Sequence, residues 1–271
     1  MTPRLVLLSD HGEHGQRLAR TLGERGIALE AVMYHARDLA PKGAGKVQRV
    51  VAKARSRWGY YRAHRWFYAP LKTRVLFVDD VDAKRTLGLM KKLAPDYILV
   101  GCGHILKQPL IETARCGVFN AHPGLLPWAR GSGVEGQSLE MGVPVGATLH
   151  YIDAGIDTGA LIERRLLPVT KSQVDLRELE EGTGQLGVEM MVDAVERIIR
   201  EGHKPNATLQ SGRFPLFRWP DAAGRKRAQG VASSGRALEL FEAWKGHTNG
   251  EPQWVLSPDL MEAPTPLTLA K

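Results

Sequence analysis

Two short segments of the sequence combine side chains that can handle protons and charge. Asn120 and His122 lie two residues apart in GVFNAHP, and the later segment DAGIDTG carries Asp153 and Asp157 among glycines. An amide and an imidazole can hold the oxygen of a polarised carbonyl, and a carboxylate can accept a proton or orient the imidazole. Each segment alone is also compatible with a structural role, as a hydrogen-bonded core pair or a tight acidic turn. DAGIDTG lacks the ligand pattern of a calcium loop.

These residues need elements that bring them together, and the apolar pattern predicts such elements. Nearly continuous apolar runs, typical of strands buried on both faces of a sheet, are RLVLLSD, IALEAVMY, RVLFV, DYILVG and GVFNA. Segments with helical spacing separate them, over 14–26, 82–93 and 109–114. This alternation predicts an α/β fold with an open, doubly wound, mostly parallel sheet. Asn120 and His122 end one strand, at the sheet edge where such folds bind ligands.

The second half of the chain is predicted to contain fewer strands. A helix over 134–141, the strand pair GATLHYID and LIERRLLPV, and a long helix over 174–201 follow in order. From Pro205 onward the sequence is richer in Pro, Gly and basic residues, with one helical segment at 235–245. We therefore expect a catalytic domain over 1–204, with a basic insertion at about 42–72, and a C-terminal appendage over 205–271.

The net charge of +8 is concentrated in one stretch. Residues 39–78 hold ten Lys or Arg and no Asp or Glu. This field favours an acidic partner, such as a phosphorylated metabolite, a nucleotide, RNA or a polyglutamylated cofactor tail. Cys102 and Cys116 are too few for a disulfide framework and lack metal-ligand spacing. No apolar run reaches the roughly 20 residues of a membrane span, so we expect a cytoplasmic protein without a membrane partner.

A basic amphipathic helix is predicted within this stretch, over residues 46–68. Its apolar positions follow helical spacing and basic residues occupy much of the remainder; the apolar positions are Val47, Val50, Val51, Ala54, Trp58 and Tyr61. We expect the aromatic side chains to pack on the core. Aromatic rings among arginines can also stack on bases, which keeps RNA open as a partner.

Taken together, GVFNAHPGLLPWARG and, about 35 residues later, LHYIDAGIDTGALI resemble the paired motifs of the 10-formyltetrahydrofolate-dependent formyltransferases. That family includes glycinamide ribonucleotide transformylase, methionyl-tRNA formyltransferase and the sugar N-formyltransferases. The resemblance rests on the order Asn, His, Pro, an LLP turn and then Asp-Thr-Gly. It implies a Rossmann-like transferase of one-carbon metabolism, with Asn120, His122 and Asp157 as its catalytic triad. Because the formyl donor is already activated, no metal is expected.

The resemblance also implies where the folate binds. The backbone of GCGHIL corresponds to the segment that lines the pteridine pocket, which gives Gly103, His104, Ile105 and Leu106. The other side is expected to be closed by Asp153, Ala154, Gly155 and Ile156. A strand-to-helix turn is the plain alternative for GCGHIL, and it is not a GxGxxG dinucleotide motif. His150 matches a strand position in several relatives, and a buried, hydrogen-bonded histidine is the alternative there.

The acceptor is less well indicated than the donor. SDHGEHGQ replaces the glycine and hydroxyl residues that bind the substrate phosphate in the ribonucleotide transformylase, and the basic insertion resembles those of sugar and natural-product formyltransferases. We therefore expect a small anionic amine, such as a nucleotide-linked amino sugar. The alternatives are a 10-formyltetrahydrofolate deformylase that uses water, and a nucleic-acid-binding protein on the same fold. A homodimer remains open.

Overall fold

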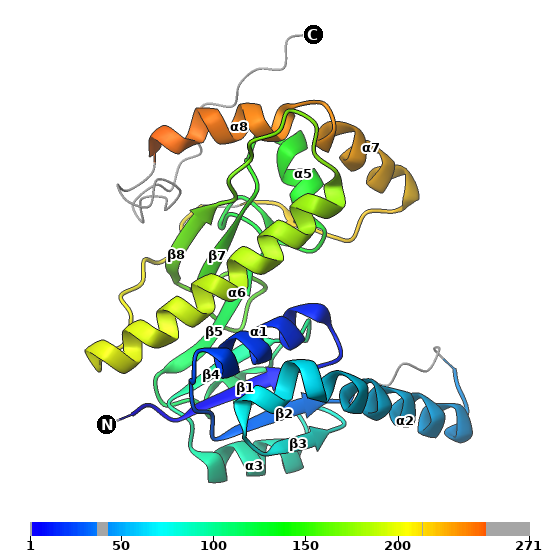
Figure 1. Ribbon diagram of the computed structural model, residues 1–271, viewed down its shortest axis with the longest axis vertical. Coiled ribbons are helices and arrows are strands. Elements are labelled where there is room, and N and C mark those ends of the chain that lie inside the picture. Colours follow the sequence, from blue (N-terminus) through cyan, green and yellow to red (C-terminus); the bar gives the residue numbers. More distant parts are fainter. Residues whose placement is uncertain (1, 37–42, 213, 248–271) are drawn as a thin grey trace. The chain divides into compact units, whose positions relative to one another are not determined.

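The computed structural model describes residues 2–36, 43–212 and 214–247, so residues 39–42 of the basic stretch and 248–271 of the expected appendage lie outside the described residues. Contacts divide the chain into two units. The first unit comprises Met1–Asn120 with Met191–Lys204, and the second comprises Ala121–Met190 with Pro205–Lys271. Figure 1 labels most of the helices and strands of both units.

The first unit carries the parallel part of the sheet. Its elements are β1 (Leu5–Ser9), α1 (Glu13–Glu24), β2 (Ala31–His35), α2 (Lys46–Ala63), a π-helix (His64–Tyr68), a 3-10 helix (Ala69–Leu71), β3 (Val75–Val78), α3 (Lys84–Leu93), β4 (Tyr97–Gly101), α4 (Gln108–Ile111) and most of β5 (Gly117–His122). The strands run parallel in the order β3-β2-β1-β4-β5. Every residue of β1, β2 and β4 is buried, because both faces of these apolar strands are covered.

Helix α2 differs from the sequence expectation in the face that it buries. The helix forms, but its contacts to the unit are made by Ala52, Ser56 and Tyr60. The Tyr60 ring packs against Tyr34 and Phe77 at centroid distances of 5.0 Å. The expected apolar stripe faces solvent instead. Small residues at 52 and 56 let the helix approach closely, and spacing alone did not distinguish the two faces.

The second unit contains the antiparallel part of the sheet and the C-terminal helices. Its elements are β6 (Arg130–Gly131), α5 (Val134–Glu140), β7 (Gly146–Tyr151), β8 (Leu161–Leu166), the first part of α6 (Leu176–Glu201), β9 (Leu216–Phe217), α7 (Ala222–Ala232), α8 (Arg236–Trp244) and a 3-10 helix (Lys245–His247). Strands β7 and β8 pair antiparallel. The seven-stranded order β3-β2-β1-β4-β5-β7-β8 is mostly parallel and open, which confirms the predicted α/β fold.

The segment after Lys204 contributes to the core of the second unit. Helix α7, which the sequence did not predict, packs on α5 so closely that a Cβ on Gly136 would lie 2.3 Å from the Ala228 Cβ. Apolar side chains of α7 and α8 join one buried cluster with Leu139 and Leu179. Trp244 meets Trp128 edge-on at 5.2 Å between ring centroids.

Candidate active site

His122 is the last residue of β5, and its imidazole is buried. Its Nε2 lies 2.7 Å from the carbonyl oxygen of Ala129. Because a carbonyl only accepts, Nε2 carries the hydrogen in this contact. The other nitrogen, Nδ1, then faces Asp157, whose Oδ2 is 3.6 Å away. A Cβ on Gly124 would lie 3.0 Å from Nε2, so the glycine leaves the room that the ring needs.

Asp157 is held in an unusual backbone conformation. Its φ is +53°, in the left-handed region that Asp and Asn tolerate better than most residues. The Gly131 amide donates to its Oδ2 at 2.9 Å, and the Gln210 side chain donates to its backbone oxygen at 3.0 Å. Arg130 binds the residue before Asp157: its Nε and Nη2 both donate to the Ile156 backbone oxygen, at 3.0 and 2.7 Å. These contacts fix the carboxylate beside His122.

The glycines of the turn are required by space. A Cβ on Gly159 would lie 1.8 Å from the Tyr151 oxygen, and one on Gly155 would lie 2.0 Å from Thr158 Oγ1. Asp153 closes the same turn, since its Oδ1 accepts hydrogen bonds from the Gly155 amide at 3.0 Å and Thr158 Oγ1 at 2.6 Å. The turn is therefore tightly built, as well as exposed from Asp153 to Ile156.

His150 approaches the same carboxylate from β7. The pairing of β7 with β8 is irregular between Leu149 and His150, and such irregularities re-aim side chains near functional sites. His150 Nδ1 lies 2.7 Å from the Tyr151 oxygen, and its Nε2 lies 3.9 Å from Asp157 Oδ1. Burial lowers the pKa of His150 to about 4. His150 is therefore neutral at neutral pH, as expected of a buried, hydrogen-bonded histidine.

The structure thus brings His122 and Asp157 together, as the motifs predicted. Asn120 is half-buried and lies in β5 two residues before His122, a spacing that puts both residues on the same face of the strand. Asn120 belongs to the first unit and His122 to the second, so their joint action stays a prediction. Sequence reasoning missed Arg130, Gly131 and Gln210, because none of them stands out by type or spacing from other polar and glycine residues.

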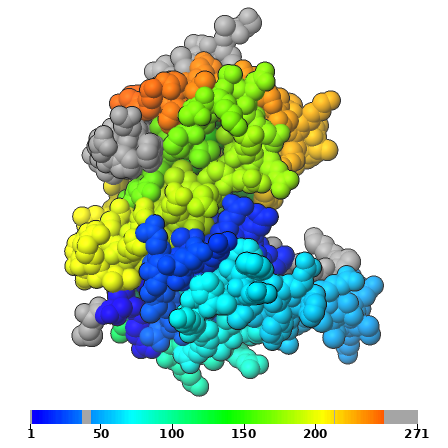
Figure 2. All heavy atoms as spheres, in the orientation of Figure 1, coloured from blue at the N-terminus to red at the C-terminus, as the bar shows by residue number. Residues whose placement is uncertain are grey.

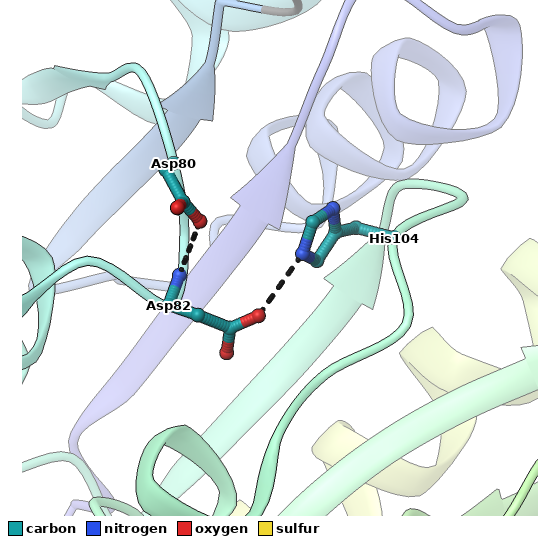
Figure 3. Close-up of side chains that lie close together, drawn as sticks. All are labelled: Asp80, Asp82 and His104. Carbon is teal, nitrogen blue, oxygen red and sulfur yellow. Dashed lines mark hydrogen bonds and ion pairs between the residues drawn. The ribbon is translucent and has the colours of Figure 1, made fainter.

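The expected folate loop lies in the first unit, between β4 and α4. Gly103 and Ile105 are exposed, His104 is partly exposed and Leu106 is buried. Asp82 contacts this loop through both carboxylate oxygens. Its Oδ2 lies 3.2 Å from His104 Nε2 (Figure 3). Its Oδ1 accepts from the Lys107 amide at 3.1 Å. One carboxylate, which the sequence did not single out, therefore holds the loop at His104 and at Lys107, just before α4.

Asp80 joins Asp82 and His104 in a cluster whose ligand atoms lie within 4.8 Å of one another. Two carboxylates and an imidazole are able to hold a divalent cation. The observed hydrogen bonds explain the cluster without an ion, because Asp80 Oδ1 accepts from the Asp82 amide at 2.9 Å and Asp82 in turn anchors the loop. The expectation that no metal takes part stays a prediction.

Among the described residues, no helix combines the length and apolarity needed to cross a bilayer.

Comparison with known proteins identifies relatives of the chain. Residues 4–195 match the family model described as formyl transferase. Methionyl-tRNA formyltransferase of Chromohalobacter salexigens is 34% identical over 124 residues, which are 45% of this chain and 37% of that protein. The matched segment therefore spans well under two thirds of that relative's length.

Solved structures agree on the fold. A 4-N formyltransferase from Francisella tularensis superposes with a TM-score of 0.57 at 16% identity, covering 85% of this chain and 88% of that one. A sugar N-formyltransferase from a Shewanella species gives a TM-score of 0.53 at 14% identity, covering 86% and 88%. At such identities the likeness concerns the fold alone. Since the family model covers most of the chain, the protein belongs to the formyl transferase family.

Proposed function

We propose that this protein transfers a formyl group from 10-formyltetrahydrofolate to the amine of a small anionic acceptor. The observation that carries the proposal is the pair of His122 Nδ1 and Asp157 Oδ2, 3.6 Å apart, with the imidazole buried and the carboxylate partly buried, in a chain of this family. Bound 10-formyltetrahydrofolate would supply a formyl carbon that is already activated towards attack by an amine. The residues of the chain then need only to hold charge and move protons.

Protonated His122 and the Asn120 amide donate to the formyl oxygen while an amine nitrogen attacks the carbon. Losing one such preorganised donor typically costs about 2.7 to 4 kcal/mol of barrier. Asp157 accepts the proton that the attacking nitrogen releases, directly or through a water. His122 gives its Nδ1 proton to N10 of the folate as the carbon–nitrogen bond breaks, so tetrahydrofolate leaves neutral at that nitrogen. The proton on Asp157 returns to His122 across 3.6 Å, which resets both groups.

The two expected folate-binding segments are each suited to a flat ring with donors and acceptors along one edge. In the first unit, the loop over Gly103–Leu106 offers exposed backbone and the side chain of Ile105, which is 66% exposed. In the second unit, the turn over Asp153–Ile156 offers the same combination, with Ile156 37% exposed. Backbone groups with apolar side chains are what a pteridine site needs.

The acceptor is proposed to be an anionic amine, such as a nucleotide-linked amino sugar. The ten basic residues and absence of acidic ones over 39–78 favour an anionic ligand. A sugar N-formyltransferase and a 4-N formyltransferase are among the proteins of similar fold, which is compatible with this class. The sequence relative acts, by its name, on methionyl-tRNA, so the acceptor must be tested directly.

The test is formyl transfer by the full chain from 10-formyltetrahydrofolate to a panel of amines: nucleotide-linked amino sugars, neutral amino sugars and methionyl-tRNA. Tetrahydrofolate formation and the mass of the formylated product are measured together. We expect turnover with an anionic amino sugar and its loss in His122→Gln, which keeps an amide to meet the Ala129 oxygen. Folate turnover without any amine would indicate a deformylase. No turnover and no folate binding would refute the proposal.

A further inference from the structure

Helix α2 exposes an apolar surface that no part of the described chain covers. Its most exposed apolar side chains are Val47 at 77%, Val50 at 66%, Trp58 at 65% and Tyr61 at 62%. At 100° per residue, these side chains, with Val51 and Ala54, occupy one uninterrupted arc of the helix. The arc does not include the buried side of α2, which is made of two small residues and one tyrosine.

Basic residues flank this apolar arc on both sides. Lys46 and Arg57 lie along one edge of the arc, and Arg55 and Arg62 lie along the other. All four are exposed, and no acidic residue occurs anywhere in α2. In Figure 1 the helix extends beyond the strand ends of its own unit, and Figure 2 shows it at the surface in light blue to cyan.

A hollow of about 600 Å³ adjoins the edge of the arc that carries Arg55 and Arg62. Its lining includes Arg55 and Arg62 together with the rings of Trp58 and Trp66. Trp66 is itself 63% exposed. Guanidinium groups and indole rings in one lining suit an anionic group that sits next to apolar material, and Trp is enriched where membranes meet water.

We propose that α2 docks the protein on an anionic phospholipid membrane, as a helix that lies in the plane of the interface. The apolar arc would enter the headgroup and acyl boundary, the flanking Lys and Arg would meet lipid phosphates, and the hollow would receive a headgroup. Such docking requires no membrane-spanning helix, and none was found among the described residues. It departs from the sequence expectation of no membrane partner, which rested on the absence of a membrane span. The inference does not depend on formyl transfer, because it involves neither His122 nor Asp157, although it uses basic residues of the same 39–78 stretch that favours an anionic acceptor.

Two other occupants fit the observations less well. A second copy of the chain would place arginines of one α2 beside arginines of the other, with no acidic residue in the helix to pair with them. A nucleic acid would use the arginines and the aromatic rings, but Val47, Val50 and Val51 make neither phosphate nor stacking contacts. A bilayer surface uses the valines, the rings and the charges together.

The test measures co-sedimentation of the full chain with vesicles, without folate or acceptor present. Vesicles contain phosphatidylcholine and phosphatidylglycerol in equal parts, or phosphatidylcholine alone. One variant removes apolar side chains, Val50→Ser with Trp58→Ser, and one removes charge, Arg55→Gln with Arg62→Gln. The matched control is Trp219→Ser, because Trp219 is 71% exposed and lies in the second unit. Thermal unfolding is measured for each variant to check that it is folded.

We expect the native chain and the control to bind the anionic vesicles much more tightly than the neutral ones. The apolar variant should lose at least about tenfold in affinity. The charge variant should lose about twenty-five- to thirtyfold, since each basic residue near an anionic surface strengthens binding about fivefold. Unchanged binding of the apolar variant would overturn the proposal. So would an absence of vesicle binding, whether accompanied by tight binding of single-stranded RNA or by a dimer that the apolar variant abolishes.

Discussion

Replacing Asp157 with Asn isolates the charge of the carboxylate from its geometry. Asn tolerates the left-handed backbone at this position at least as well as Asp does, and its side-chain oxygen can still accept the Gly131 amide. The fold and the turn should therefore persist in Asp157→Asn. What is lost is a negative charge 3.6 Å from His122 Nδ1 and the ability to accept a proton.

The separation sets the size of the effect. Opposite unit charges 3.6 Å apart attract by about 4.6 kcal/mol at an effective dielectric constant of about 20. Each 1.36 kcal/mol corresponds to a factor of about ten in rate, so a loss of the full attraction sets an upper bound of about two thousandfold, reached only if the attraction acts in the transition state alone. General base assistance alone is commonly worth about a hundredfold or more. We therefore expect Asp157→Asn to slow formyl transfer by between about a hundredfold and two thousandfold.

The assay is the single-turnover rate of tetrahydrofolate formation at saturating folate and acceptor, with thermal unfolding measured in parallel. The matched control is Glu189→Gln, the same change of charge on an exposed residue of α6 that Gln185 contacts at 3.0 Å. The control should react within about twofold of the native protein, since surface substitutions are usually small in effect. A folded Asp157→Asn variant that also reacts within a few-fold of native would refute the role of the charge.

Three further outcomes are expected. Burial lowers the pKa of His150 from its ordinary 6.5 to about 4, so the unfolded state takes up the proton first, and the stability present above pH 6.5 is lost as the pH falls towards 4. Over this window the unfolding free energy of the native chain should fall more than that of His150→Asn, by up to about 3 kcal/mol. Parallel curves for the two proteins would contradict this. Gly159→Ala should destabilise the chain and abolish transfer, because its Cβ would lie 1.8 Å from a backbone oxygen. The control Gly184→Ala in α6 meets nothing within 4 Å and should leave the free energy of unfolding unchanged or raise it by about 0.5 to 1 kcal/mol. Denaturant titrations that rank the two variants in the opposite order would show that the turn is not tight. A folate analogue should raise the melting temperature by binding the native state, and an unchanged melting temperature at saturating analogue would count against the folate site.

The sheet was predictable because its strands are nearly continuous apolar runs separated by helical segments. The approach of Asp157 to His122 was also predictable, but only from the two motifs taken as a pair. Neither residue type nor spacing alone distinguished them from a structural histidine and an acidic turn. The motif order supplied what local physical chemistry left open.

The features that sequence reasoning missed depend on tertiary contacts. The buried face of α2 is decided by Ala52 and Ser56, whose small size allows close approach, while the more apolar stripe stays exposed. Helix α7 lacks a strong apolar period and is held by its contact with Gly136. Gln210 donates to the Asp157 backbone oxygen from 53 residues later in the chain, and no local pattern predicts such a contact.

The most direct test of the central claim is a double-mutant cycle between His122→Gln and Asp157→Asn, followed by the single-turnover rate of formyl transfer. Because the two side chains are proposed to exchange one proton, removing the second should add little once the first is gone. We predict that the double variant reacts within about threefold of the slower single variant. If the two losses multiply instead, His122 and Asp157 act independently and the account is contradicted.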